Sequence, residues 1–223
     1  MKSSYGAGIG LLAALALCMP TSSEACIHVV AFTKDDAVAA VARADRLLAQ
    51  GRPATAYNVS RRARHRLEQH LRQSPRDAVT RALVERARRI TALAVVRLDG
   101  NSPISARAAR RGVVRGRQAR SLGWALEQLR ERAEAYPDDV RTRVHYAEAL
   151  ARTEGRRDEA RAILVRLAEQ DLMPDPHGYA TLVRLTNPVT HRERWEHALT
   201  RCQQMASSRA EHICPRVSRP PGS

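Results

Sequence analysis

Three residues near the C-terminus, Cys202, His212 and Cys214, are of types that can do chemistry together. Two thiols and an imidazole can hold zinc, but zinc sites usually pair their cysteines as Cys-x-x-Cys, and that spacing is missing here. Two cysteines with eleven residues between them can instead close a disulfide that pins the terminal segment onto the preceding helix. The sequence therefore favours a Cys202–Cys214 disulfide. Free thiols, or a pairing of Cys26 with one of the two, are the alternatives.

The motifs of common enzyme classes are absent from the sequence. It contains no His-Glu-x-x-His, no Gly-x-Ser-x-Gly and no phosphate-binding loop behind a strand. His191 and His197 lie six residues apart, which places them on different faces of a helix, and Glu193 and Glu196 fit a solvated helix face. We therefore expect no enzyme, no cofactor and no metal ion.

Positive charge is concentrated in one stretch of the chain. The formal net charge is +15, with 36 Arg and 2 Lys, and residues 52–120 alone carry 18 Arg against four acidic residues. Such a field attracts polyanions and acidic partners, and salt weakens it. The arginines of this candidate basic surface are Arg61, Arg62, Arg64, Arg66, Arg86, Arg88, Arg89, Arg110, Arg111, Arg115 and Arg117.

Two interpretations of this basic stretch stay open. Successive arginines wrap around a helix and cannot all point one way, so they can form an ordinary solvated face. They can also form a surface for an acidic protein, an anionic envelope polymer or a membrane surface. Only Tyr57 supplies an aromatic ring near the first run, which argues against binding of single-stranded nucleic acid by base stacking.

The first 25 residues have the pattern of a secretory signal peptide. Lys2 precedes the apolar run 9–19, and small residues at Ser23 and Ala25 predict cleavage after Ala25. The mature chain, without a transmembrane segment, is then expected to be exported, either periplasmic or extracellular. Lipidation of Cys26 is the disfavoured alternative, because polar residues separate this cysteine from the apolar run.

The elements that must position these groups are helices. Apolar residues spaced by three and four over 38–48 predict a first helix that begins at Asp35 or Asp36 and ends at Gly51. Pro53 suits the first turn of a second helix, which runs to about residue 73.

A third helix is predicted from its start signals. Ser74 can cap it, with Asp77 completing a capping box, and Val79 opens an apolar face that continues to Val96. Residues 104–120 are either a weak helix or an exposed basic connector, because two internal glycines each cost a helix about 1 kcal/mol relative to alanine. A further amphipathic helix follows over 122–136.

The clearest pattern covers residues 137–174. Two short amphipathic helices flank Gly155, and Pro174 closes the unit, so neither apolar face can be buried without stacked neighbours. A last helix pair is expected over 175–206. Trp124 and Trp195 have leucine neighbours at helical spacing and are expected in the core. The residues expected to carry the packing of the 137–174 unit are Ala147, Leu150, Gly155, Ala160 and Leu164.

The 137–174 unit resembles the tetratricopeptide repeat. Tyr146-Ala147, Leu150, Gly155, Glu159-Ala160, Leu164 and Ala168 match its small and large apolar positions and its turn glycine. Weaker units cover 37–73 and 176–206. The resemblance implies an all-α domain over 26–214, built of antiparallel helical hairpins stacked as a short right-handed solenoid, and a disordered tail over 215–223. It also implies a concave face that binds proteins or peptides.

The expected function is therefore that of an exported interaction module for an unidentified protein or peptide. The alternative is an arginine-rich binder of anionic envelope polymers or of a membrane surface. Nucleic acid is a disfavoured partner, because export separates the chain from it.

Overall fold

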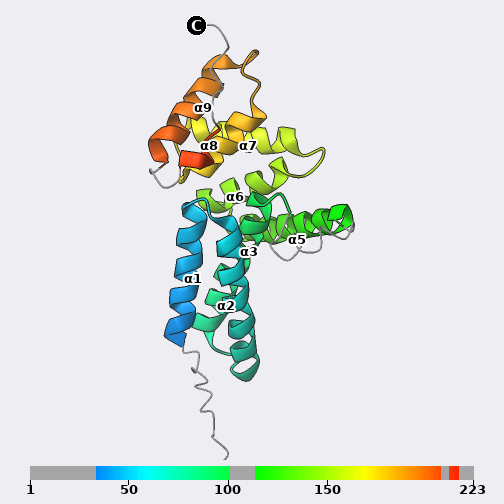
Figure 1. Cartoon of the computed structure of the whole chain (residues 1–223), viewed down its shortest axis with the longest axis vertical. Coiled ribbons are helices and arrows are strands. Elements are labelled where there is room, and N and C mark those ends of the chain that lie inside the picture. The colour runs from blue at the N-terminus through cyan, green and yellow to red at the C-terminus, as the bar shows by residue number, and fades with distance from the viewer. Residues whose placement is uncertain (1–33, 101–113, 207–210, 216–223) are drawn as a thin grey trace, which may run out of the picture. The chain divides into compact units, whose positions relative to one another are not determined.

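The computed structural model describes residues 34–100, 114–206 and 211–215 (Figure 1). Within these ranges the chain is all-α, as the sequence predicts, with eight α-helices and one 3-10 helix. The helices are α1 (Lys34–Ala49), α2 (Pro53–Gln73), α3 (Ala78–Arg97), α5 (Val114–Ala135), α6 (Val140–Ala151), α7 (Arg157–Glu169), α8 (Pro176–Leu185) and α9 (Arg192–Met205), and the 3-10 helix is η1 (Glu211–Ile213).

The helices pack mostly in the order of the chain. Each consecutive pair, from α1 with α2 to α8 with α9, forms an antiparallel-like contact. A second series of contacts joins alternate helices, because α1 touches α3, α3 touches α6 and α6 touches α8. The helices α1, α3, α6 and α8 therefore form a connected row, and each is flanked by the helix that follows it.

The core of α1–α3 is built largely from small side chains. Ala44, Ala56 and Ala87 are fully buried, and Ile90 and Leu67 fill the space between them. Alanine lets helix backbones approach closely, and it is also the best helix former. The three long helices can therefore pack closely and bury one continuous apolar core between them.

The core of α6–α9 is built from larger side chains. Leu164, Leu167, Leu182 and Tyr179 are all fully buried, together with Cys202 of α9. The residues expected to carry the 137–174 unit lie in or beside this core: Ala147, Leu150, Ala160 and Leu164 are fully buried. The turn residue Gly155 has φ +72°, a left-handed conformation that favours glycine.

Two helix starts differ in how well the sequence predicts them. Pro53 begins α2 as expected. At α3 the expectation is wrong, because Asp77 itself is the N-cap and accepts hydrogen bonds from the backbone N–H and the hydroxyl of Thr80, at 3.1 and 2.8 Å. Ser74 instead ends α2, where its N–H donates to the His70 carbonyl. Serine and aspartate are comparable N-caps, and Asp77 takes this role because Ser74 is still part of the end of α2.

Two apolar residues expected in the core are exposed. Val79 keeps 54% of its surface, because the buried face of α3 begins only at Thr80 and Val84. Trp124 on α5 keeps 37%, and the guanidinium of Arg64 lies 5.8 Å from its ring centroid. Trp195, by contrast, packs against the α6–α9 core as expected.

Several sequence expectations fall outside the described residues. These are the signal peptide over 1–25, Cys26, Arg110 and Arg111, and residues 216–223 of the tail. The uncertain stretch 104–120 is helical from Val114 onward, and its earlier part is likewise outside. Of the helices in the described ranges, none has the length and apolar character needed to cross a membrane.

Candidate functional site

The predicted disulfide is confirmed, and it positions a closing segment, residues 211–214. Cys202 of α9 is bonded to Cys214, directly after η1. The closing segment reaches the turn between α1 and α2, where the Nε2–H of His212 donates to the Gly51 carbonyl at 3.1 Å. His212 therefore joins the closing segment to the turn between α1 and α2, and both cysteine sulfurs are used in the disulfide rather than offered to a metal.

The arginines of α2 in the candidate basic surface are partly neutralised. Arg61, Arg62 and Arg66 are exposed. Arg64 lies 3.5 Å from the carboxylate of Glu68, its neighbour one turn along the helix. Such an exposed pair contributes little stability, but it does lower the field that a ligand would meet.

The arginines of α3 are more completely paired. Arg86 and Arg89 both bind the carboxylate of Asp45 on α1, at 2.6 and 3.2 Å, and Arg88 pairs with Glu85 at 3.1 Å. Arg89 keeps only 10% of its side-chain surface. It is therefore a bridge between α1 and α3 rather than the surface arginine that the sequence suggests. The side chains of Arg115 and Arg117 are outside the description.

These α3 arginines lie along a groove that the sequence pattern does not reveal. The groove has a volume of about 840 Å³ and runs between α3 and α5, closed at one end by the start of α6. Six arginines and four acidic residues line it. They are Arg81, Arg86, Arg88, Arg89, Arg132 and Arg141, with Asp45, Glu85, Glu131 and Asp139.

Three groove arginines, Arg81, Arg132 and Arg141, carry charge that no carboxylate in the described part of the chain neutralises. Arg81 donates instead to the Pro75 carbonyl at 2.7 Å. Arg132 and Arg141 have no acidic partner there, and the buried Nε of Arg132 has no hydrogen-bond acceptor. Burial lowers the pKa of Arg89; Asp45 opposes this, and the nearby charges of Arg132 and Arg141 lower it further. The guanidinium of Arg132 also lies 5.0 Å from the ring centroid of Tyr136, which is 54% exposed. The groove thus combines crowded positive charge with an open aromatic face.

A second polar cluster is buried where α3, α6 and α8 meet. Arg97, at the end of α3, binds Glu148 of α6 through two hydrogen bonds of 2.8 and 2.9 Å. It also lies 3.6 Å from Asp175, the N-cap of α8, and donates to the Leu48 carbonyl of α1 at 3.4 Å. Arg97 and Glu148 are both almost fully buried, so one guanidinium links four helices.

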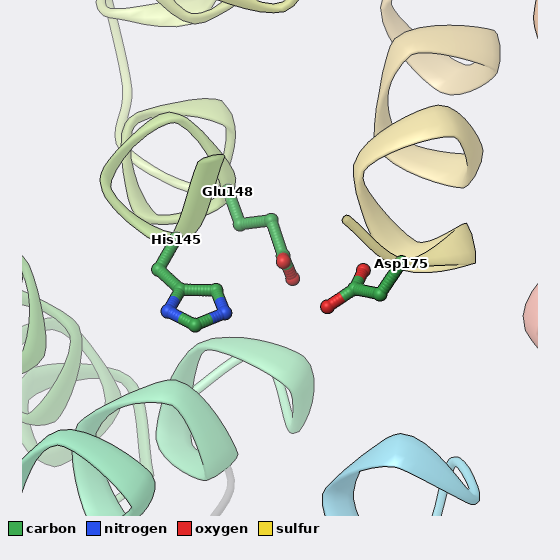
Figure 2. A group of neighbouring side chains, drawn as sticks. All are labelled: His145, Glu148 and Asp175. Atoms are coloured by element: carbon green, nitrogen blue, oxygen red, sulfur yellow. The ribbon is translucent and has the colours of Figure 1, made fainter. Parts of the chain in front are cut away.

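The same cluster contains the one group with metal-ligand geometry among the described residues. Figure 2 shows His145 and Glu148 projecting from α6, and Asp175 facing Glu148 from the start of α8. Their ligand atoms all lie within 4.8 Å of one another. However, Arg97 already occupies both carboxylates, and a metal cation placed among them would be repelled by the guanidinium. The donor set is therefore used as an ion-pair cluster in this structure.

The histidines beside this cluster are held neutral. Burial lowers the pKa of His145 well below its ordinary value, and the charge of Arg97 lowers it further, against the raising effect of Asp175. Burial and Arg97 likewise lower the pKa of His177 to about 3. Burial raises the pKa of Glu148, and the contacts with Arg97 oppose that shift.

Arg97, Glu148 and Asp175 were missed as a group by reasoning from the sequence. They lie far apart in the chain, and their contact depends on how α3, α6 and α8 stack. One local signal exists: Arg97 is the only charged residue in the stretch 90–97, the most apolar segment of α3. A lone charge at the end of a buried run requires a partner.

Comparison with family models, with curated proteins and with solved structures finds no match for this chain. The described part of the chain is therefore characterised by its fold: it is all-helical, and its eight α-helices pack mostly as sequential pairs.

Proposed function

We propose that this chain is a tetratricopeptide-like helical-repeat module that binds an acidic, extended segment of a partner protein in the groove between α3 and α5. The order of packing supports the repeat part of the proposal. Helices α1, α3, α6 and α8 touch one another in turn, and each is flanked by the next helix in the chain. Stacked helical hairpins give this pattern, and such stacks present extended binding surfaces.

The proposal that the groove binds an acidic segment rests on arginine charge in the groove that no carboxylate neutralises. Arg132 and Arg141 face an open channel without acidic partners in the described ranges, beside the partly desolvated Arg89. Carboxylates of a ligand would relieve the repulsion among these guanidinium groups and accept their hydrogen bonds. The exposed ring of Tyr136 supplies a flat apolar contact next to them.

The alternative function, binding of long anionic polymers or a membrane surface by diffuse charge, has less support. Glu68 binds Arg64 of α2 at 3.5 Å and the groove residue Arg88 of α3 at 3.8 Å, so the exposed faces of α2 and α3 are partly neutralised. Arg61 and Arg62 remain exposed, and they provide a fair test of a diffuse mechanism. Export of the mature chain, without lipid at Cys26, belongs to the same proposal, and the intact mass of the secreted protein tests it.

The test compares two double variants that remove equal charge. A fluorescently labelled octaglutamate peptide is titrated against the wild type, against Arg132→Gln/Arg141→Gln, and against Arg61→Gln/Arg62→Gln as the matched control. We expect the groove variant to weaken binding about tenfold, equivalent to about 1.4 kcal/mol, and the control to change it less than about twofold. Equal weakening in both variants would favour the diffuse mechanism.

Salt separates the two mechanisms further. Diffuse binding should collapse between about 0.05 and 0.3 M salt, because exposed charges are screened over about one Debye length. Binding in the groove should keep most of its affinity, because part of the contact is apolar and desolvated. A wild-type affinity that disappears completely in this range would contradict the groove proposal.

A further inference from the structure

A small cavity, separate from the groove, lies where the closing segment meets the row of helices. Its volume is about 150 Å³. The ends of α3 and α6 form one wall, α8 forms another, and the turn at Gly51 closes one side. His212 and Ile213 of the closing segment complete the enclosure. The cavity is large enough for one small group and is lined mainly by polar residues.

Three guanidinium groups line this cavity, and they differ in their partners. Arg97 is held by Glu148 and Asp175, as described above, and Arg152 pairs with Asp99 at 2.5 Å. Arg184 of α8 has no carboxylate partner in the described residues, and it donates only to the hydroxyl of Thr181, at 3.1 Å.

Arg184 is an exposed residue whose charge has no carboxylate partner among the described residues. Part of its side chain is exposed, yet the protein around it lowers its pKa by desolvation, and the charge of Arg152 lowers it further. Glu148 and Asp99 oppose this effect only from a distance, since each already binds another arginine. The cavity therefore contains one guanidinium whose hydrogen-bonding capacity is largely unused.

A buried imidazole also lines this space. His177 is 8% exposed, and its Nδ1 makes no hydrogen bond, because the Asp175 carboxylate lies 3.7 Å away from it. Because its pKa is lowered to about 3, the ring is neutral and can offer one N–H without adding a charge.

We propose that this cavity binds one monoanionic carboxylate group. Arg184 would hold it through paired N–H donors, Arg152 would contribute its charge from the side, and His177 would donate the remaining hydrogen bond. The charge balance selects a monoanion, because the other two guanidinium groups already have carboxylates. The group can belong to a free small acid or to the end or side chain of a peptide, and both share this chemistry.

The test is a titration of the disulfide-bonded protein, followed by nuclear magnetic resonance at constant ionic strength. Acetate and chloride compare a carboxylate with a simple monoanion, and sulfate tests a dianion. We expect acetate to give saturable shifts of the backbone amides of His177, Thr181 and Arg184. Arg184→Gln should weaken acetate binding at least about tenfold. Arg166→Gln on α7 is the matched control, because Arg166 is exposed and lies outside both binding sites.

Further titrations identify whether the carboxylate belongs to a free small acid or to a peptide. A tetrapeptide with a free C-terminus is compared with its amidated form, and tighter binding of the free form than of acetate assigns the cavity to peptides. Sulfate binding as tightly as acetate, shifts that survive in Arg184→Gln, or no saturable shift with any carboxylate would overturn the proposal. Melting curves of Arg184→Gln verify that it is folded. Because the groove variants at Arg132 and Arg141 leave this cavity unaltered, the two proposals can fail separately.

Discussion

The two ends of the described chain reach stability by different routes. Helices α1–α3 are 16 to 21 residues long and pack through alanines, whereas α6–α9 are 10 to 14 residues long and pack through leucines and a tyrosine. Longer helices are more stable in isolation, because the cost of nucleation is spread over more hydrogen bonds. Short helices depend more on side-chain volume, on capping and on the covalent bond between Cys202 and Cys214.

Charge follows the same division. The stretch from 52 to 120 holds most of the excess arginines, while residues 121–223 carry 16 Arg against 15 acidic residues. In the C-terminal region the carboxylates of Asp139 and Asp175 cap α6 and α8. In the N-terminal region the few acids bridge several arginines each, as Asp45 does. Arg132 and Arg141, on which the proposed groove binding depends, lie outside the stretch 52–120, so the excess of arginine in the sequence does not by itself locate the proposed site.

Arg97 should give the largest effect, because it joins the two regions. Arg97→Met leaves Glu148 and Asp175 buried without a cation, which should lower the free energy of unfolding by about 3–5 kcal/mol. Urea unfolding followed by circular dichroism measures it. Adding Glu148→Gln should restore part of the loss, since the second change removes the stranded charge. A stability unchanged in Arg97→Met would show that the regions do not depend on this contact.

The two cores should respond differently to a change in side-chain volume: α6–α9 should lose stability when volume is removed, and α1–α3 when volume is added. Leu164→Ala should cost about 2–5 kcal/mol, because the leucine is fully buried among large side chains. In the alanine-packed region, enlargement should be harmful instead: Ala63→Leu should cost about 1–3 kcal/mol. The exposed residues Val189 and Ala54 provide controls, as Val189→Ala and Ala54→Leu. The comparison would fail if Ala63→Leu stabilised the protein, since that would reveal loose packing of α2 against its neighbouring helices.

Acid should weaken the C-terminal region first. The pKa values of His145 and His177 are lowered in the folded protein, so the unfolded chain binds more protons below their ordinary value of 6.5. Stability should therefore be complete above about pH 6.5 and fall as the pH drops, by at most about 1.4 kcal/mol per pH unit for each histidine. Urea unfolding at pH 7.5, 6 and 5 tests this.

The double variant His145→Gln/His177→Gln supplies the control for the acid effect, because it should lose less stability between pH 7.5 and 5 than the wild type does. The raised pKa of Glu148 acts in the opposite direction, so a wild type that gains stability toward pH 5 would mean that Glu148 outweighs the histidines.

Substitutions of two turn glycines should change the stability least, and they compare two turns that differ in their surroundings. Gly51 and Gly155 both have positive φ, so alanine is strained at either, by about 1 kcal/mol. At Gly155 an added methyl group meets open space, whereas at Gly51 it meets the imidazole of His212. Gly51→Ala should therefore cost about 2 kcal/mol, and the excess should vanish when His212→Ala is added. Equal melting temperatures for the two glycine variants would show that the closing segment can shift away from the added methyl group at little cost in stability.

Local features were predictable from the sequence, and contacts between distant helices were not. Pro53 and Gly155 act within a turn of their neighbours, and Cys202 and Cys214 are only 12 positions apart, so spacing alone locates them. Asp77 was assigned the wrong role because a serine and an aspartate both cap helices, and only the position of Thr80 decides between them.

The candidate sites depend on stacking and so were largely hidden in the sequence. The pairing of Arg86 and Arg89 with Asp45 needs α1 and α3 to lie side by side, and a composition of basic residues cannot show it. Arg132 lies outside the expected basic stretch 52–120, yet it carries part of the uncompensated charge of the groove. Its importance follows only from its distance to Arg89 and Arg141.

The contact between His212 and Gly51 has a consequence for the order of assembly. It joins residues 161 positions apart, while the main helix contacts connect neighbours along the chain. Local contacts of that kind can form while a chain is still being synthesised, whereas a contact between its two ends must wait. Each helical pair can therefore pack early in folding, but the cavity acquires its last wall only when the closing segment reaches the turn at Gly51.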